Sequence, residues 1–253
     1  MIKIRNLFKS FRDNQVLSGL DLDIVDGETI TIIGGSGSGK SVLLKNIMGL
    51  LNPDSGSVEI DGTEITTLND EQLLDVQKKF GYLFQGAALF DSLTVQDNVA
   101  FGIRNMVDVG KFDITKRVSD CLAMVGLKNI EELKPSELSG GMRKRVGLAR
   151  AIAYSPKYIL YDEPTTGLDP IMADVINNLI LHLQKTINVT SIVVTHDMKS
   201  AYKVSNRIAM LYQGKIVGIG TPNEIENTKN PIIRQFIDGK SDGPIKIDTD
   251  ITL

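Results

Sequence analysis

Cysteine is nearly absent from this chain of 253 residues, which contains Cys121 alone. A single cysteine cannot form an internal disulfide, and no Cys/His spacing typical of a metal site occurs. This composition suits a reducing compartment. We predict that Cys121 lies in the core, and that His182, which falls outside the apolar stripe of its predicted helix, lies on the surface.

Long apolar runs are also missing from the sequence. No stretch approaches the roughly 18 residues that a membrane-spanning helix needs, and residues 1–5 do not resemble a signal peptide. If the protein acts at a membrane, we therefore expect another chain to hold it there. The net charge is −3 and no basic block occurs, which argues against nucleic acid as the main ligand. Hydrophobic residues make up 42% of the chain, enough for a full core.

One glycine-rich segment matches a phosphate-binding pattern at every fixed position. Residues 34–41 read GGSGSGKS, which fits G-x-x-x-x-G-K-[ST]. An apolar strand is predicted over residues 28–33, and apolar residues at helical spacing follow the glycines. Glycines let backbone N–H groups approach an anion closely, and the N-terminus of the next helix attracts negative charge. A flexible Gly/Ser-rich loop is the alternative interpretation, and the flanking strand and helix argue against it.

The predicted phosphate-binding loop gives two side chains specific tasks. We predict that Lys40 reaches the β- and γ-phosphates of a nucleotide, and that the Ser41 hydroxyl binds Mg²⁺. The predicted nucleotide-binding residues of the loop are Gly34, Gly35, Ser36, Gly37, Ser38, Gly39, Lys40 and Ser41.

Strands and helices alternate after this loop, which predicts an α/β fold with a largely parallel core sheet. Before the loop, alternating apolar and polar residues over 2–24 predict antiparallel strands, and Asp26–Gly27 is a predicted hairpin turn. Residues from 86 to about 155 are helical by pattern and indicate a helical subdomain inserted into the sheet domain. Residues 239–253 are polar and are predicted to form an extended tail.

Two acidic residues follow a predicted strand that is apolar on both faces. Asp162 can hold the Mg²⁺ shell, and Glu163 can orient and deprotonate a water, a contribution worth about 10²–10⁴-fold in rate. The alternative is that the two acids merely end a strand. His196 follows the next predicted strand, where it is either a functional residue or an ordinary histidine at a strand end.

A second glycine-containing helix start is predicted at residues 138–145, which read LSGGMRKR. Ser139 is a predicted N-cap. Gly140 and Gly141 free the backbone there, so this helix start is a second candidate anion site.

The order of these motifs resembles the ABC ATPases, with the likeness covering residues 1–238. The matching motifs are the Walker A motif 34–41, the Q-loop residue Gln85, the signature 138–142, the Walker B motif 159–163, the D-loop 167–169 and the H-loop residue His196. The resemblance implies a P-loop NTPase fold, ATP and Mg²⁺ as ligands, and ATP hydrolysis with Glu163 as the base.

The resemblance also implies roles that the residues alone leave open. Gln85 would contact Mg²⁺ and the attacking water, and His196 the γ-phosphate. Phe11 would stack on adenine, although by itself it is predicted to be a core or hinge residue. In this family the signature contacts ATP bound by another protomer, which implies a homodimer. The nucleotide-binding residues implied for the seam are Ser139, Gly140, Gly141 and Asp169.

Three segments narrow the resemblance to the MlaF-type ATPases of MCE phospholipid transport systems. They are residues 84–90 with 97–100, residues 135–142, where Met142 replaces the usual glutamine, and residues 234–244. The resemblance implies transport of phospholipids between the bacterial inner and outer membranes, from the cytoplasmic face of the inner membrane. The implied partners are an MlaE-like permease and an MCE-domain protein, with a STAS-domain protein as a further candidate.

Other interpretations stay open at this point. The chain could serve a transporter of another solute, or a cell-division regulator that signals through ATP-driven closure. A chromosomal, DNA-repair or ribosomal ABC protein would carry long insertions or two ATPase domains, and neither is found. We predict that the apolar segment 86–90 docks a permease. The alternative is ordinary core packing of Leu89 and Phe90.

Overall fold

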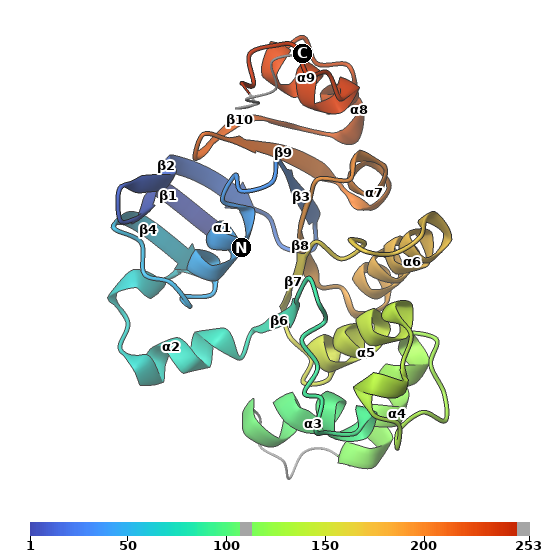
Figure 1. Cartoon of the computed structure of the whole chain (residues 1–253). Coiled ribbons are helices and arrows are strands. Elements are labelled where there is room, and N and C mark those ends of the chain that lie inside the picture. Colours follow the sequence, from blue (N-terminus) through green and yellow to red (C-terminus); the bar gives the residue numbers. More distant parts are fainter. Residues whose placement is uncertain (107–112, 247–253) are drawn as a thin grey trace.

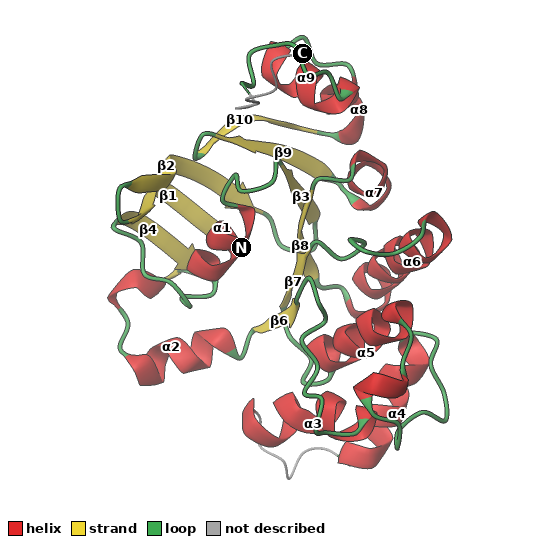
Figure 2. Cartoon of the chain, viewed as in Figure 1, coloured by secondary structure: helices red, strands yellow, loops and turns green. Residues whose placement is uncertain are grey.

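The computed structural model describes residues 1–106 and 113–246, which form two β-sheets with helices around them (Figure 1, Figure 2). The smaller sheet has the strand order β2-β1-β4-β5, and the core sheet has the order β10-β9-β3-β8-β7-β6. The small sheet comprises β1 (Ile2–Phe11), β2 (Asn14–Ile24), β4 (Ser55–Ile60) and β5 (Thr63–Glu64). The core sheet comprises β3 (Thr29–Ile33), β6 (Phe80–Leu83), β7 (Tyr158–Asp162), β8 (Thr190–Thr195), β9 (Arg207–Tyr212) and β10 (Lys215–Gly220).

The small sheet is antiparallel, as its alternating sequence predicts. The predicted hairpin at Asp26–Gly27, however, is wrong, because the chain passes there from β2 into the other sheet. Strand β3 is buried on both faces and pairs in parallel with β8 and β9. The turn is fastened to the core sheet, since the Gly27 N–H donates to Thr190 Oγ1 at 2.9 Å.

The core sheet is parallel from β9 to β6, and only β10 runs antiparallel. The predicted fold class is therefore confirmed. The register aligns the carboxyl ends of four strands: Ile33 lies opposite Thr195, Asp162 opposite Val194, and Leu83 opposite Tyr161. The loops that follow these strands therefore meet at one edge of the sheet, where ligands bind in open α/β folds.

Apolar side chains of the core sheet alternate between two layers. In β7, Tyr158 and Leu160 pack into a core shared with the small sheet and α1 (Lys40–Ile47). Ile159 and Tyr161 belong to a second core on the opposite face. Figure 1 shows α1 and α2 (Asp70–Gln77) on the side of the small sheet, and α5 (Gly140–Ile152) and α6 (Pro170–Ile187) on the other.

The predicted helical insertion is confirmed. It consists of α3 (Val95–Met106), α4 (Ile114–Met124) and α5 (Gly140–Ile152), followed after β7 by α6 (Pro170–Ile187). Cys121 is fully buried in α4, and His182 is exposed on α6, as predicted. Short 3-10 helices span Ile65–Thr67 and Pro135–Glu137. None of the helices in the described part of the chain is both long and apolar enough to cross a membrane.

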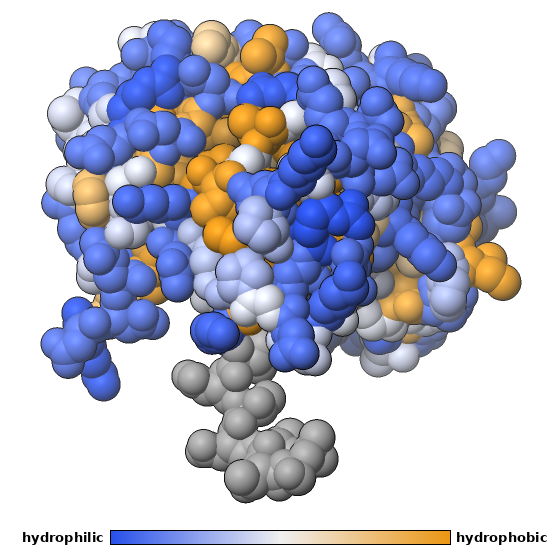
Figure 3. All heavy atoms as spheres, turned by 90° about the horizontal axis from the view of Figure 1, so that it is seen from above, coloured by the Kyte–Doolittle hydropathy of each residue, from blue (hydrophilic) through white to orange (hydrophobic). Residues whose placement is uncertain are grey.

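The C-terminal segment folds back on the protein. It contains α7 (Met198–Val204), α8 (Pro222–Glu226) and α9 (Pro231–Asp238). The buried Gln235 amide donates to three backbone carbonyls of the following turn, and its oxygen accepts from the Ile245 N–H at 2.6 Å. Residues 239–246 are therefore not extended, contrary to prediction, and residues 247–253 lie outside the described part. Seen from this end, hydrophilic side chains cover most of the surface (Figure 3).

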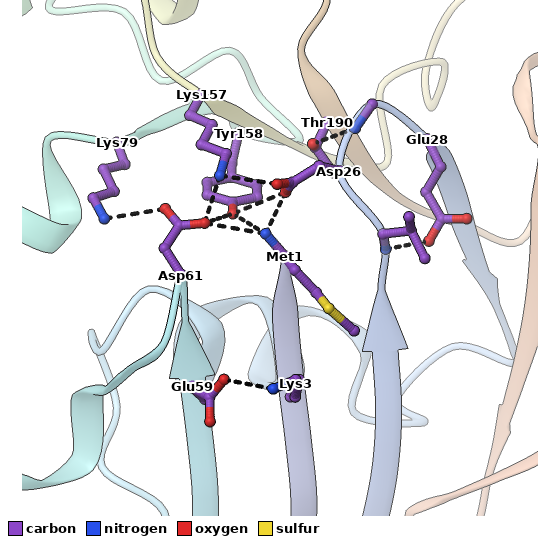
Figure 4. Close-up of polar contacts among 12 residues, drawn as sticks. Met1, Lys3, Asp26, Glu28, Glu59, Asp61, Lys79, Lys157, Tyr158 and Thr190 are labelled. Atoms are coloured by element: carbon purple, nitrogen blue, oxygen red, sulfur yellow. Dashed lines mark hydrogen bonds and ion pairs between the residues drawn. The ribbon is translucent and has the colours of Figure 1, made fainter.

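An ionic cluster joins the two sheets at the amino ends of the core-sheet strands, opposite the end where the loops described above meet (Figure 4). Asp61, in the turn after β4, accepts hydrogen bonds from Tyr158 Oη at 2.7 Å and from Lys79 Nζ at 3.1 Å. Lys157 Nζ contacts both Asp61 and Asp26. Asp26 and Asp61 are thus tied to Tyr158, the first residue of β7, and to the lysines that directly precede β6 and β7.

Candidate functional site

The glycine-rich loop after β3 is packed at its ends and open in the middle. A Cβ on Gly34 would lie 2.5 Å from the Leu211 carbonyl oxygen, and one on Gly39 would lie 2.7 Å from Val16 Cγ1. Around Gly35, by contrast, no atom lies within 4 Å of the position that a Cβ would take. Strands β2 and β9 hold the loop, while its middle faces open space.

Lys40 begins α1 and holds a buried charge at this loop. Its side chain is 7% exposed and donates to the carbonyls of Gly34 and Gly35 at 2.9 and 3.0 Å. The nearest carboxylate oxygen, Glu163 Oε1, is 3.7 Å away. Burial lowers the pKa of Lys40, and the charges of Glu163 and Asp162 oppose that shift. A phosphate would supply the compensating charge that the carbonyls cannot.

Asp162, the last residue of β7, is held by two hydroxyl donors. Ser41 Oγ donates to Oδ1 at 2.9 Å, and Tyr82 Oη donates to Oδ2 at 3.0 Å. Burial raises the pKa of Tyr82, and the charge of Asp162 raises it further, so the hydroxyl remains a donor. The oxygens of Ser41 and Asp162 are of the hard type that Mg²⁺ prefers. Sequence reasoning missed Tyr82, because nothing separates it from the other apolar residues of β6.

Glu163 follows directly and sits in a conformation that is uncommon for residues with a side chain. Its φ is 49°, and such strain is concentrated at functional sites. His196 Nδ1 lies 3.0 Å from Glu163 Oε2, which also accepts from Thr166 Oγ1 at 3.0 Å and Thr195 Oγ1 at 3.3 Å. The structure thus brings together the predicted base and the predicted histidine.

Lys144 is a second buried lysine that sequence reasoning did not single out. It lies on α5 and is 5% exposed. Its Nζ donates to the carbonyl of Gln85 and, at 3.1 Å, to that of Glu163. Burial lowers the pKa of Lys144, against the charges of Glu163 and Asp162. It ties α5 to both loops, and only its place on the inner face of an amphipathic helix could have indicated this.

The glycine-rich loop, Lys40 and Glu163 line a cleft of about 680 Å³, within the range of small-molecule sites. Of the predicted residues, those that line it are Gly35, Ser36, Gly37, Ser38, Gly39, Lys40, Ser41, Gln85, Glu163 and His196. Val16 from β2 and Phe236 from α9 also line the cleft, and neither was predicted. The chemistry of this edge is that of an anion site with a carboxylate beside it.

Comparison with known proteins identifies the family. The family model described as ABC transporter matches residues 17–166. The chain belongs to this family. It is the ATPase subunit of a transporter.

Individual relatives match far beyond the family model. MlaF of Haemophilus influenzae, an "intermembrane phospholipid transport system ATP-binding protein", is 39% identical over 97% of this chain and 93% of its own. MetN of Carboxydothermus hydrogenoformans, a "methionine import ATP-binding protein", is 40% identical over 94% of this chain and 71% of its own. The cassette MJ0796, solved as a dimer, superposes with a TM-score of 0.80 at 34% identity, over 88% of this chain and 99% of its own.

Several residues with ABC motif roles lie outside the cleft. Ser139 caps α5, and its Oγ accepts from the Met142 N–H at 3.2 Å. Gly140 and Gly141 form the first turn of that helix. Asp169 caps α6 and accepts from two N–H groups at 3.0 Å. Within one chain, these four predicted residues cap or begin the helices in which they lie. Their role in binding nucleotide stays a prediction.

Phe11 is the remaining residue with a predicted nucleotide contact. It ends β1 with 43% of its surface exposed, so it is not a core residue. The Lys9 ammonium lies 5.6 Å from its ring centroid. Phe11 does not line the cleft, and stacking on adenine stays a prediction.

Proposed function

We propose that this protein hydrolyses ATP to drive movement of phospholipids between the inner and outer membranes of a bacterium. The observation that carries this proposal is the likeness to MlaF, which spans 93% of that relative and extends well beyond the ATPase motifs. Identity alone does not separate the solutes, since MetN is equally similar. MetN, however, is matched over a smaller share of its length, and residues 234–244 resemble the MlaF type.

In the proposed reaction, the loop after β3 and Lys40 bind the β- and γ-phosphates. Glu163 accepts a proton from the attacking water, and His196, 3.0 Å from its carboxylate, orients that group and contacts the γ-phosphate. Ser41, Asp162 and Gln85 would hold Mg²⁺, which supplies charge neutralisation at the phosphate oxygens. No cluster of three or more His, Cys, Asp or Glu side chains within residues 1–106 and 113–246 could hold a metal. A protein site with so few ligands suits a metal that arrives with phosphates.

A homodimer would complete the site. The cleft of one chain is not lined by Ser139, Gly140, Gly141 or Asp169. The similar cassette MJ0796 was solved as a dimer. We propose that these residues contact the nucleotide held by a second copy. ATP then favours the closed dimer because it binds that state better.

An apolar groove beside the cleft offers a docking site for the permease. Its volume is about 440 Å³, and it exposes Phe84, Phe90 and Phe101 by 40, 43 and 40%. Leu89 packs into the helical core, so the alternative reading of ordinary packing holds for Leu89 and not for Phe90. Exposed aromatic clusters of this kind mark interaction sites.

The loop that borders this groove is held in a fixed, uncommon conformation. Ala87 and Ala88 have φ values of 62° and 45°. Arg150 donates to their carbonyls at 2.6 and 2.7 Å. A strained loop fastened by a partly buried arginine supports a prepared binding surface. We propose that an MlaE-like permease docks here and holds the protein at the cytoplasmic face of the inner membrane, with an MCE-domain protein and a STAS-domain protein as further partners.

The test is gentle purification from the native membrane, followed by mass spectrometry of the bound proteins and lipid. We expect a polytopic permease, an MCE-domain protein and enriched phospholipid. A different permease with a receptor for a soluble solute would overturn the phospholipid proposal, while a cell-division membrane protein would indicate signalling.

A matched pair of variants tests the groove in the same experiment. Phe90→Glu should lose the permease, because a charge replaces an exposed aromatic in the groove. Ile219→Glu, at a residue of β10 that is 42% exposed, should retain it. Equal recovery of the permease with both variants would contradict docking at the groove.

A further inference from the structure

Among the residues described, Tyr82 alone lines the apolar groove and also bonds to Asp162, the carboxylate that accepts from Ser41 of the cleft. Its ring centroid lies 4.2 Å from that of Phe84, at the groove. Its hydroxyl donates to Asp162 Oδ2 at 3.0 Å. The side chain is almost entirely buried, at 8% exposure. A single phenol therefore spans the two sites.

A second tyrosine of the groove shows that this link is specific. Tyr154 lines the same groove, but its hydroxyl donates to the Phe80 carbonyl. Both hydroxyls are phenolic, and both tyrosines line the groove. They differ in partner: one holds backbone of β6, and the other holds the carboxylate that faces Ser41.

We infer that Tyr82 is a positioning residue, through which pressure on the groove changes the geometry of Asp162. The part of this inference that concerns partner binding rests on the proposed function of the groove. The part that concerns Asp162 depends on the ATPase site alone.

The hydroxyl matters because Asp162 is buried and has one donor on each oxygen. Ser41 fixes Oδ1 and Tyr82 fixes Oδ2, so the plane of the carboxylate is set by both. Without Tyr82 Oη, a buried charged oxygen would lose its donor, which is costly. Partners that orient metal-binding carboxylates typically contribute about 10–100-fold to metal affinity.

At the groove, Phe84 offers a partner a direct contact to the Tyr82 ring. Phe84 is 40% exposed and packs directly against the Tyr82 ring. A partner that presses on Phe84 must move or brace that ring. Because the phenol is rigid from ring to hydroxyl, the motion reaches Asp162 without any intervening residue. Docking at the groove would thereby tune how well the site holds Mg²⁺.

The first test measures metal binding directly in the full chain bound to ADP, with Mn²⁺ followed by electron paramagnetic resonance. Tyr82→Phe should raise the Mn²⁺ dissociation constant about tenfold, while the affinity for metal-free ADP stays unchanged. Tyr154→Phe removes the same atom from the same groove and should leave Mn²⁺ affinity unchanged. Unchanged Mn²⁺ affinity in Tyr82→Phe, or an equal loss in both variants, would overturn the inference.

The second test asks whether the groove acts through the hydroxyl. Phe84→Ala should shift Mn²⁺ affinity in the wild-type background and have little effect in the Tyr82→Phe background, a non-additive double-mutant cycle. Additive effects would refute the link. Failure of the link is distinguishable from failure of the docking proposal, because recovery of the permease with Phe90→Glu is measured separately.

Discussion

Lysine and carboxylate side chains gather at both ends of the core-sheet strands, but they serve different purposes at the amino ends and at the carboxyl ends. At the amino end of the strands, Asp61 accepts hydrogen bonds from Lys79, Lys157, Tyr158 and the amino group of Met1 (Figure 4). Tyr158 is buried, but water reaches the charged groups of this cluster. At the carboxyl edge, Lys40 is 7% exposed and lies no nearer than 3.7 Å to a carboxylate. An ion with many partners holds elements together, whereas a buried ion with few partners is ready for a ligand.

The pKa shifts follow from this difference. Burial alone would raise the pKa of Asp61, but the hydrogen bonds from Lys157, Tyr158, the Met1 amino group and Lys79 together hold it well below its usual range. At the cleft, burial dominates and lowers the pKa of Lys40. Charge at the amino edge is fully compensated by the protein itself. At the carboxyl ends of the strands, the charge of Lys40 would be compensated by a bound anion.

The comparison would be tested most severely by Glu163→Gln. This change should reduce kcat by about 10²–10⁴-fold, since the base is lost, while ATP still binds and the closed dimer accumulates. Steady-state phosphate release, nucleotide affinity and size-exclusion chromatography measure the three effects. Normal turnover would remove Glu163 from the role of base.

Lys40→Ala should act on binding and not on folding. Loss of charged hydrogen bonds worth about 1.5–3 kcal/mol should weaken ATP affinity by roughly 10–100-fold. The free energy of unfolding should change little, because the cost of burying the charge offsets its hydrogen bonds to Gly34 and Gly35. Titration with a fluorescent nucleotide and urea unfolding separate the two quantities, and unchanged ATP affinity would contradict the phosphate contact.

Asp61→Asn, at the amino ends of the strands, should lower stability and leave ATP binding unchanged. We expect a loss of about 1 kcal/mol in the free energy of unfolding, in the range of partly exposed ion pairs, with unchanged ATP affinity. Glu59→Gln is the control, since Glu59 has the single partner Lys3 at 2.8 Å. A smaller loss for Asp61→Asn than for Glu59→Gln would break the comparison.

The pH dependence is the subtlest of these effects. The pKa of Asp61 is lowered in the folded protein, so its stabilisation is present above its unfolded pKa, near 4. It is lost as the pH falls further, toward the folded pKa. The stability difference between wild type and Asp61→Asn should stay constant from pH 8 to 5 and shrink below pH 4. A difference that shrinks instead between pH 8 and 5 would point to another group.

The sequence revealed the residues whose chemistry depends on spacing. The glycines with Lys40 and Ser41, and the acidic pair after β7, can be recognised locally because each group is contiguous in the chain. The apolar periods also predicted β7, α6 and the helical insertion. Contacts between distant segments gave no such signal.

Tyr82 and Lys144 illustrate what a local pattern cannot reveal. Each is an ordinary residue of its strand or helix, and its partner lies 80 or 19 positions away. The turn at Asp26–Gly27 was misjudged because its sequence does not say which sheet receives the next strand. The tail was misjudged because one buried amide, Gln235, organises backbone groups up to ten positions further on.

The solitary cysteine has a practical consequence for watching this protein move. Cys121 is fully buried, and burial raises the pKa of its thiol to about 11, so little reactive thiolate forms at neutral pH. A cysteine introduced at an exposed position, such as Ile171 with 77% exposure, would therefore react almost alone. The native cysteine therefore need not be removed before labelling. One spectroscopic probe on each copy of the chain could then report opening and closing of the dimer.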